Sequence, residues 1–194
     1  MSKKFLSKEL IVSVAFQMID EMGTDNFSIR QLAARLGVQV SSLYNHIKNE
    51  YDLLLEVAKL SSVMYTDYIQ ESVSGLPLEE ATYKAGFAFR TFLKEHKYLY
   101  ALLLDQRWIG DPEFEKAIER FVEPIYFILE QYGIEDKPSQ DHMYVAMRVV
   151  THGFSTLDSL GVFDNLSVDP ADSYRMMMQG VINMMKDLGN NAEK

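Results

Sequence analysis

The stretch that decides the fold is SIRQLAARLGVQVSSLYNHIK, residues 28–48. Ser28 is a suitable helix N-cap, and apolar residues follow it at three- and four-residue spacing as far as Gly37. Glycine can adopt the left-handed conformation that a tight turn needs, and a second helix is then predicted over residues 39–47, with Leu43 and Ile47 as its apolar anchors. Two short helices joined by a glycine turn form a helix-turn-helix, for which an ordinary helical corner is the alternative.

The segments on either side of this motif are also helical in pattern. Between Ser7, a suitable N-cap, and Gly23, a suitable stop, apolar residues line one helical face. After the motif, Asn49 and Asp52 occupy the reciprocal positions of a capping box that opens a helix towards Ser72. At about 1.5 Å per residue this helix spans roughly 30 Å or more, so it can join two modules mechanically.

The rest of the chain continues the helical pattern with few glycines and prolines. Aspartate–proline pairs at 111–112 and 169–170 each combine an N-cap with a first-turn proline, and another helix is expected over about 139–160. We therefore expect an all-α protein of about nine helices. Its predicted domains are a helix-turn-helix domain over residues 1–50 and a helical domain over residues 51–194, joined by the long helix.

Composition narrows the class of protein. The 194 residues include no cysteine, which excludes a disulfide framework and a thiolate metal site. No apolar stretch approaches the roughly 20 residues that cross a bilayer and no signal-peptide pattern is present, so we expect a cytoplasmic protein without membrane contact. The formal net charge is −9, yet residues 1–50 hold six Lys and Arg against five Asp and Glu. This asymmetry fits a DNA-facing head on an acidic body that the duplex repels.

Residues 28–54 closely resemble the DNA-binding signature of the TetR family. The Leu-Gly-Val turn at 36–38, the Leu-Tyr-x-His-x-Lys run at 43–48 and the Leu-Leu pair that follows match in order and spacing. The resemblance covers roughly residues 7–60 and implies a dimeric transcriptional regulator with a DNA-binding head and a body that senses a small molecule. Glu50 departs from the pattern, because many family members have lysine there and a carboxylate repels phosphate.

The motif indicates which residues contact DNA. The second helix carries short hydrogen-bonding side chains that suit base edges in the major groove, and one valine that suits a thymine methyl: Gln39, Ser41, Ser42, Asn45 and Val40. Tyr44, His46 and Lys48 lie where the helix leaves the groove and suit phosphate oxygens, and Ser28 at a helix N-terminus does so too. The resemblance also implies a base contact for Arg30. The alternatives are that Tyr44 packs between helices, that His46 is a solvated turn residue and that Arg30 only pairs with an acid.

The body is rich in aromatic residues, most of which belong to the core. Ligand cavities are mostly apolar with a few polar groups, and the residues expected to line one are Tyr65, Tyr68, Phe89, Phe92, Trp108, Phe127, His152 and Met177. Residues 149–157, VVTHGFSTL, resemble a subgroup of TetR C-terminal domains with a Trp-His-Gly motif, with Thr151 in place of the tryptophan. We interpret the methionine-rich last helix as a dimer interface first and an adaptable ligand wall second.

The expected function is that of a ligand-responsive repressor that binds a palindromic operator as a homodimer and is released by a small-molecule effector. An activator of the same family is the alternative. An enzyme is a rival of another class, with His152 and Asp158 as its acid and base, but the sequence has no metal-binding histidine pair, nucleophile elbow or phosphate-binding glycine loop. A small-molecule-binding protein without DNA function is the other rival. We expect no cofactor and no metal site.

Overall fold

The computed structural model describes residues 5–192, except for the side chains of residues 120, 121, 191 and 192. Every regular element in this range is helical, which confirms the all-α prediction. The helices are α1 (Lys8–Met22), α2 (Ile29–Leu36), α3 (Val40–Leu43), α4 (Glu50–Val73), α5 (Leu78–Glu95), α6 (Lys97–Leu103), α7 (Pro112–Gln131), α8 (Lys137–Arg148), α9 (Phe154–Ser159) and α10 (Pro170–Ala192). A π-helical turn, Val149–Gly153, joins α8 to α9 without a break, so the described residues form nine helical rods, as predicted.

Side chains cap the starts of several helices, among them α1 and α4, as the sequence indicated. The hydroxyl of Ser7 accepts a hydrogen bond from the backbone N–H of Leu10 at 3.2 Å. At the start of α4, Asn49 Oδ1 accepts from the N–H of Asp52 at 2.8 Å. The return bond differs from the predicted capping box, because Asp52 accepts from the N–H of Lys48 at 3.3 Å and not from that of Asn49.

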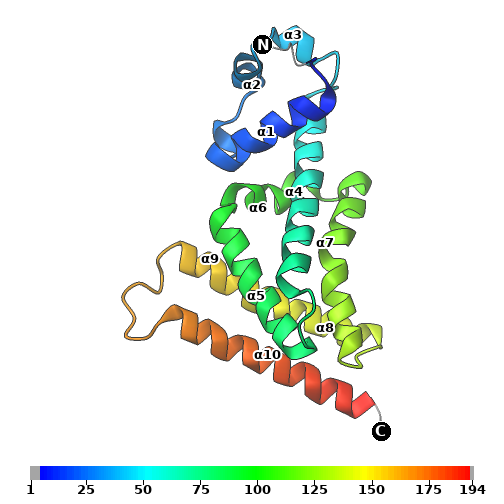
Figure 1. Ribbon diagram of the computed structural model, residues 1–194, viewed down its shortest axis with the longest axis vertical. Coiled ribbons are helices and arrows are strands. Elements are labelled where there is room, and N and C mark those ends of the chain that lie inside the picture. Colours follow the sequence, from blue (N-terminus) through cyan, green and yellow to red (C-terminus); the bar gives the residue numbers. More distant parts are fainter. Residues whose placement is uncertain (1–4, 193–194) are drawn as a thin grey trace. The chain divides into compact units, whose positions relative to one another are not determined.

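Residues 5–64 and 96–120 pack into one compact unit, which contains the three helices of the head, α6 and the first parts of α4 and α7 (Figure 1). Helix α1 packs against both α2 and α6. Nδ1 of His96, just before α6, lies 2.8 Å from Oδ2 of Asp20 in α1. The unit therefore extends beyond residue 50, where the sequence placed the end of the first domain. Three short helices bury little apolar surface by themselves, and α6 adds a second cover for α1.

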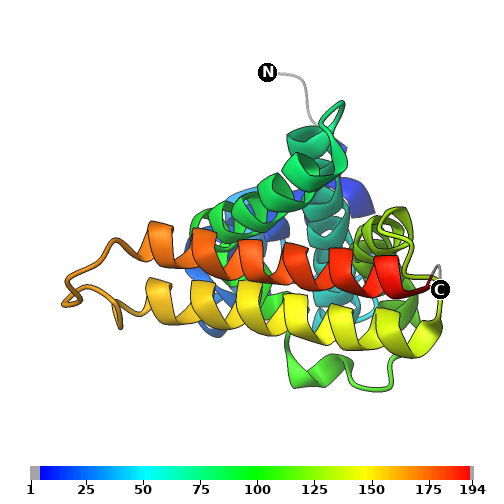
Figure 2. The ribbon, with the colours of Figure 1, turned by 90° about the horizontal axis from the view of Figure 1, so that it is seen from below.

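Residues 65–95 and 121–192 form a second compact unit. Figure 2 shows α10 lying antiparallel alongside the rod that α8 and α9 form, and α10 also packs against α5. Tyr174 and Met178 of α10 are completely buried, and the Tyr174 hydroxyl donates to the carbonyl of Gly86 in α5 at 2.7 Å. Within the described range, no helix is both long enough and apolar enough to cross a membrane.

Candidate DNA-contact surface and ligand cavity

The helix-turn-helix is built by local hydrogen bonds. Ser28 has an extended backbone, and its hydroxyl accepts from the N–H of Gln31 at 3.3 Å and donates to the side-chain oxygen of Gln31 at 2.8 Å. Gly37 ends α2 in the left-handed conformation, with φ 68° and ψ 32°. The next residue, Val38, donates its N–H to the carbonyl of Ala33 at 3.0 Å, which closes the turn. The predicted glycine turn is confirmed.

The second helix of the motif is shorter than the sequence indicated. Only four residues of α3 are α-helical, and residues 44–46 continue as a hydrogen-bonded turn in which His46 donates its N–H to the carbonyl of Leu43 at 2.9 Å. Leu43 and Ile47 are 0% and 3% exposed. Because both anchors must reach the core and Asn49 must cap the next helix, the chain tightens after Leu43.

The ten predicted DNA-contact residues all keep at least part of their surface exposed: Ser28, Arg30, Gln39, Val40, Ser41, Ser42, Tyr44, Asn45, His46 and Lys48. Eight of them lie in residues 39–48, and Ser28 and Arg30 stand at the start of α2, which contacts α3. Arg35, a basic residue of α2 that was not predicted to contact DNA, forms an ion pair within the head. Its guanidinium donates two hydrogen bonds to Glu21 at 2.6 and 2.9 Å. These bonds lower the pKa of the Glu21 carboxyl.

The first part of α4 is tied to the start of α7 within the same unit. The hydroxyl of Tyr51 donates to the carboxylate of Asp111, the N-cap of α7, and this bond lowers the pKa of Asp111. Further along, Lys59 Nζ lies 3.0 Å from Glu113 Oε2, and the hydroxyl of Ser62 donates to the carbonyl of Ala117 at 3.0 Å. Bonds at three successive positions therefore hold the two helices together.

Trp108 belongs to this junction and does not line the cavity described below. It is 2% exposed, its indole N–H donates to the carbonyl of Leu102 at 2.6 Å, and its ring stacks on Phe114 with centroids 5.2 Å apart. The predicted ligand contact of Trp108 is therefore not one with this cavity. The indole already has a buried acceptor and a stacking partner in the first unit, which leaves it a packing role.

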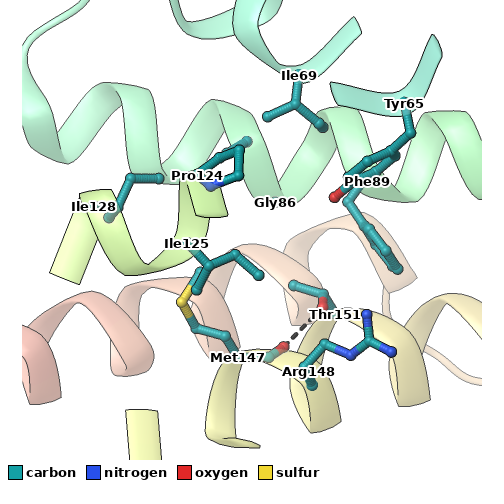
Figure 3. A pocket seen from close by; sticks show the side chains of 11 residues that line it. Tyr65, Ile69, Gly86, Phe89, Pro124, Ile125, Ile128, Met147, Arg148 and Thr151 are labelled. Atoms are coloured by element: carbon teal, nitrogen blue, oxygen red, sulfur yellow. Dashed lines mark hydrogen bonds between the residues drawn. The ribbon is translucent and has the colours of Figure 1, made fainter. Parts of the chain in front are cut away.

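The second unit contains a partly open cavity with about 530 Å³ of space free of atoms, including the solvent at its mouth. Figure 3 shows the side chains around it, which come from α4, α5, α7, α8 and the π turn: Tyr65, Ile69, Ala85, Gly86, Phe89, Pro124, Ile125, Ile128, Met147, Arg148 and Thr151. Tyr65 and Phe89 were predicted, and their rings meet edge to face at 6.0 Å. Phe92 packs behind Tyr65 at 5.2 Å without lining the cavity.

Four other predicted ligand residues lie outside this lining. Tyr68 packs its ring against Phe92 at 5.9 Å. Phe127 and Met177 are 60% and 37% exposed, because they lie on the outer sides of α7 and α10. His152 is half-buried beside Thr151, and burial, followed by the positive charge of Arg148, lowers its pKa.

The prediction missed the aliphatic and polar parts of the cavity because it weighted aromatic residues. A usable signal was present at two places, since residues 124, 125 and 128 and residues 147, 148 and 151 have the same spacing. In a helix that spacing places three side chains on one face.

The aspartate of the enzyme hypothesis, Asp158, pairs with an arginine. The Nε and Nη2 atoms of Arg90 donate to Oδ2 of Asp158 at 3.1 and 2.7 Å, and the guanidinium lies over the rings of Phe154 and Tyr174. Arg90 therefore holds the Asp158 carboxylate by hydrogen bonds and by charge. Across residues 5–192, no group of three His, Asp or Glu side chains could hold a metal ion.

Known transcriptional regulators resemble this chain in sequence and in structure. An uncharacterized HTH-type transcriptional regulator of Mycobacterium tuberculosis is 28% identical over 167 residues, which cover 84% of this chain and 75% of the relative. A TetR transcriptional regulator of Streptomyces coelicolor has a similar structure, with a TM-score of 0.74 at 14% identity over 95% of this chain and all of the other. The TetR family protein ActR of the same organism, solved in complex with actinorhodin, has a TM-score of 0.65 at 18% identity over 95% and 99% of the two chains.

Two family models match the sequence itself. The model of bacterial regulatory proteins of the tetR family matches residues 11–57, which contain the helix-turn-helix. The model of the tetracyclin repressor-like C-terminal domain matches residues 83–181, which is half of the chain. Because the two models cover both the head and most of the body, the chain belongs to the tetR family of bacterial transcriptional regulators.

Proposed function

We propose that the protein is a repressor that binds a palindromic operator as a homodimer and leaves the DNA when a small-molecule effector binds its second unit. The observation that carries the proposal is the helix-turn-helix, whose predicted base and phosphate contacts are exposed while its anchors Leu43 and Ile47 are buried. The cavity supports the effector part, since ligand sites are mostly apolar with few polar groups. On this proposal the protein acts by binding alone and catalyses no reaction.

The test is binding to DNA from upstream of the protein's own coding region and of neighbouring genes, by gel shift and footprinting. A dimer with two recognition elements should protect two half-sites about 34 Å apart, related by a dyad. Transcription measured in a reconstituted system then separates the two modes. A repressor lowers the transcript level from the bound promoter, whereas an activator raises it.

Lys48→Ala is expected to weaken binding to specific and nonspecific DNA by similar factors. Lys48 is exposed and follows the recognition element, where an ammonium group suits a phosphate oxygen. Loss of one phosphate contact should reduce the slope of log affinity against log salt by about one unit. Lys116→Ala is the matched control, because it removes the same charge from an exposed position on α7. An unchanged salt slope in Lys48→Ala would contradict the phosphate contact.

The second copy of the chain is proposed to bind across α8, α9 and α10. Residues 137–160 and 170–192 include large apolar side chains that the described chain leaves exposed: Val145, Val149, Leu157, Leu160, Met176, Met177, Met184 and Leu188. Where exposed apolar side chains gather into one patch, the patch marks an interaction site. A two-fold interface here would match the symmetry of a palindromic operator.

Helix α4 is the proposed route from effector to DNA. It is one continuous helix from Glu50 to Val73; Tyr51 lies in its first turn, and Tyr65 and Ile69 line the cavity. A ligand that displaces those two side chains would tilt the helix and move the recognition elements out of register with successive major grooves. The effector can do this only if it binds the tilted conformation more tightly than the DNA-binding one. A shift of the two conformations from a ratio of 1:99 to 99:1 needs a difference in binding free energy of about 5.5 kcal/mol.

This route predicts reciprocal coupling between operator and effector. Once an effector is identified by displacement of the protein from DNA, operator DNA should weaken effector binding by the same factor as the effector weakens operator binding. Calorimetric titration of the effector with operator, with nonspecific DNA and without DNA measures this factor. Equal effector affinity in all three titrations would contradict the switch.

A further inference from the structure

We propose that the effector is an apolar, ring-containing molecule that carries an anionic group, such as a carboxylate, and that this group pairs with Arg148. The inference rests on the proposed function, because it takes the cavity of the second unit as the effector site. It adds the chemical class of the ligand, which neither the fold nor the family matches state.

The shape of the cavity provides the first argument. In Figure 3, Pro124 and Ile128 lie towards one end, and Phe89, Arg148 and Thr151 lie towards the other. The first end offers aliphatic contacts. The second combines an aromatic ring with a guanidinium and a hydroxyl. A ligand that fills both ends therefore needs an apolar body with its polar group at one end.

Charge provides the second argument. Among the described residues around the cavity, Arg148 is the only one with a charged side chain, and none is acidic. Residues 51–194 carry 23 Asp and Glu against 13 Lys and Arg, so the positive charge at the cavity is opposite in sign to the net charge of the body. Burial, and after it the positive charge of Arg148, lowers the pKa of the neighbouring His152. Next to apolar walls, where water screens charges poorly, a guanidinium favours a carboxylate over its neutral amide.

The π turn provides the third argument. Arg148 is the last residue of α8, and Thr151 lies inside the π turn that follows. Single π turns within α-helices occur frequently at functional sites. The hydroxyl of Thr151 donates to the carbonyl of Met147 at 2.7 Å, so its proton is not available to an anion. The anionic group is therefore assigned to Arg148, and Thr151 offers lone pairs alone.

The test uses two probes of the same shape, 2-naphthoate and 2-naphthamide, which differ in charge. Binding to the full-length protein is measured by calorimetry or by quenching of the probe's fluorescence. We expect the native protein to bind naphthoate at least about tenfold more tightly than naphthamide, because a charge-assisted pair is about twice as strong as a neutral hydrogen bond. In Arg148→Gln the naphthoate affinity should fall about tenfold or more, and the naphthamide affinity should stay within about twofold.

Lys84→Gln is the matched control, because it removes one positive charge from an exposed position of α5 that does not line the cavity. Its affinity for both probes should equal that of the native protein. Retained naphthamide binding shows that Arg148→Gln is folded. If that variant does not fold, the ratio of naphthoate to naphthamide affinity in the native protein still tests whether the cavity prefers an anion.

Equal binding of the two probes to the native protein would overturn the inference, and so would an undiminished preference for naphthoate in Arg148→Gln. Neither result touches the proposed function, which is tested separately by operator binding of the unliganded protein. Conversely, a failure of the native protein to bind any upstream DNA would overturn the proposed function. The charge preference of the cavity would then still be measured by the same probes.

Discussion

Met184→Glu is expected to convert the proposed dimer to a monomer and to weaken binding to the proposed operator at least about 100-fold. Met184 lies on α10 with 44% of its surface exposed, on the same side as Met177 and Leu188. In a two-fold interface the substitution places a carboxylate in the apolar contact of each protomer. An unpaired buried charge costs about 3 kcal/mol or more, and each 1.4 kcal/mol is about tenfold in affinity.

On the proposed function each monomer reads one half-site, so operator affinity is lost together with the dimer. Sedimentation velocity at micromolar concentration measures the first effect, and a gel shift measures the second. Asn190→Glu is the control: it adds the same charge on the polar side of α10 and should leave the dimer intact. A dimeric Met184→Glu protein with native operator affinity would place the interface elsewhere.

Gly189→Ala is expected to lower the free energy of unfolding by about 3 kcal/mol, the upper end of the cost of overpacking. A Cβ at Gly189 would lie 1.8 Å from the carbonyl oxygen of Tyr132 and 3.0 Å from its carbonyl carbon. Both are backbone atoms, so no rotamer change relieves the clash. The last turns of α10 must move away from the end of α7, and the packing of Leu129 and Ile134 against Met185 loosens with them.

Denaturant unfolding followed by circular dichroism measures this effect, at one fixed protein concentration because the stability of a dimer, as proposed here, depends on concentration. Asn190→Ala changes the adjacent exposed residue and should stay within about 0.5 kcal/mol of the native protein. A Gly189→Ala protein as stable as this control would mean that α10 does not pack against Tyr132 in solution.

The helix-turn-helix could be predicted because its determinants are local. Ser28 caps α2 by accepting from an N–H three residues along the chain, Gly37 closes a turn with the residues just before it, and Asn49 caps the next helix. Bonds of this kind depend on side-chain chemistry and spacing within one or two turns, which a sequence displays directly. The predicted length of α3 was wrong because this length does not depend on local bonds alone. It depends on how Leu43 and Ile47 both reach the core, and that is a tertiary condition.

By itself, the sequence determined the helical class, the order of the helices, the DNA-binding motif and the polar face that this motif exposes. The tertiary structure decided which side chains share the cavity, that Trp108 lies outside it, and that Asp158 pairs with Arg90, 68 residues away. Helical periodicity states which residues share a face of one helix. It does not state which faces of different helices meet, because that choice is made by the packing of apolar surfaces far apart in the chain.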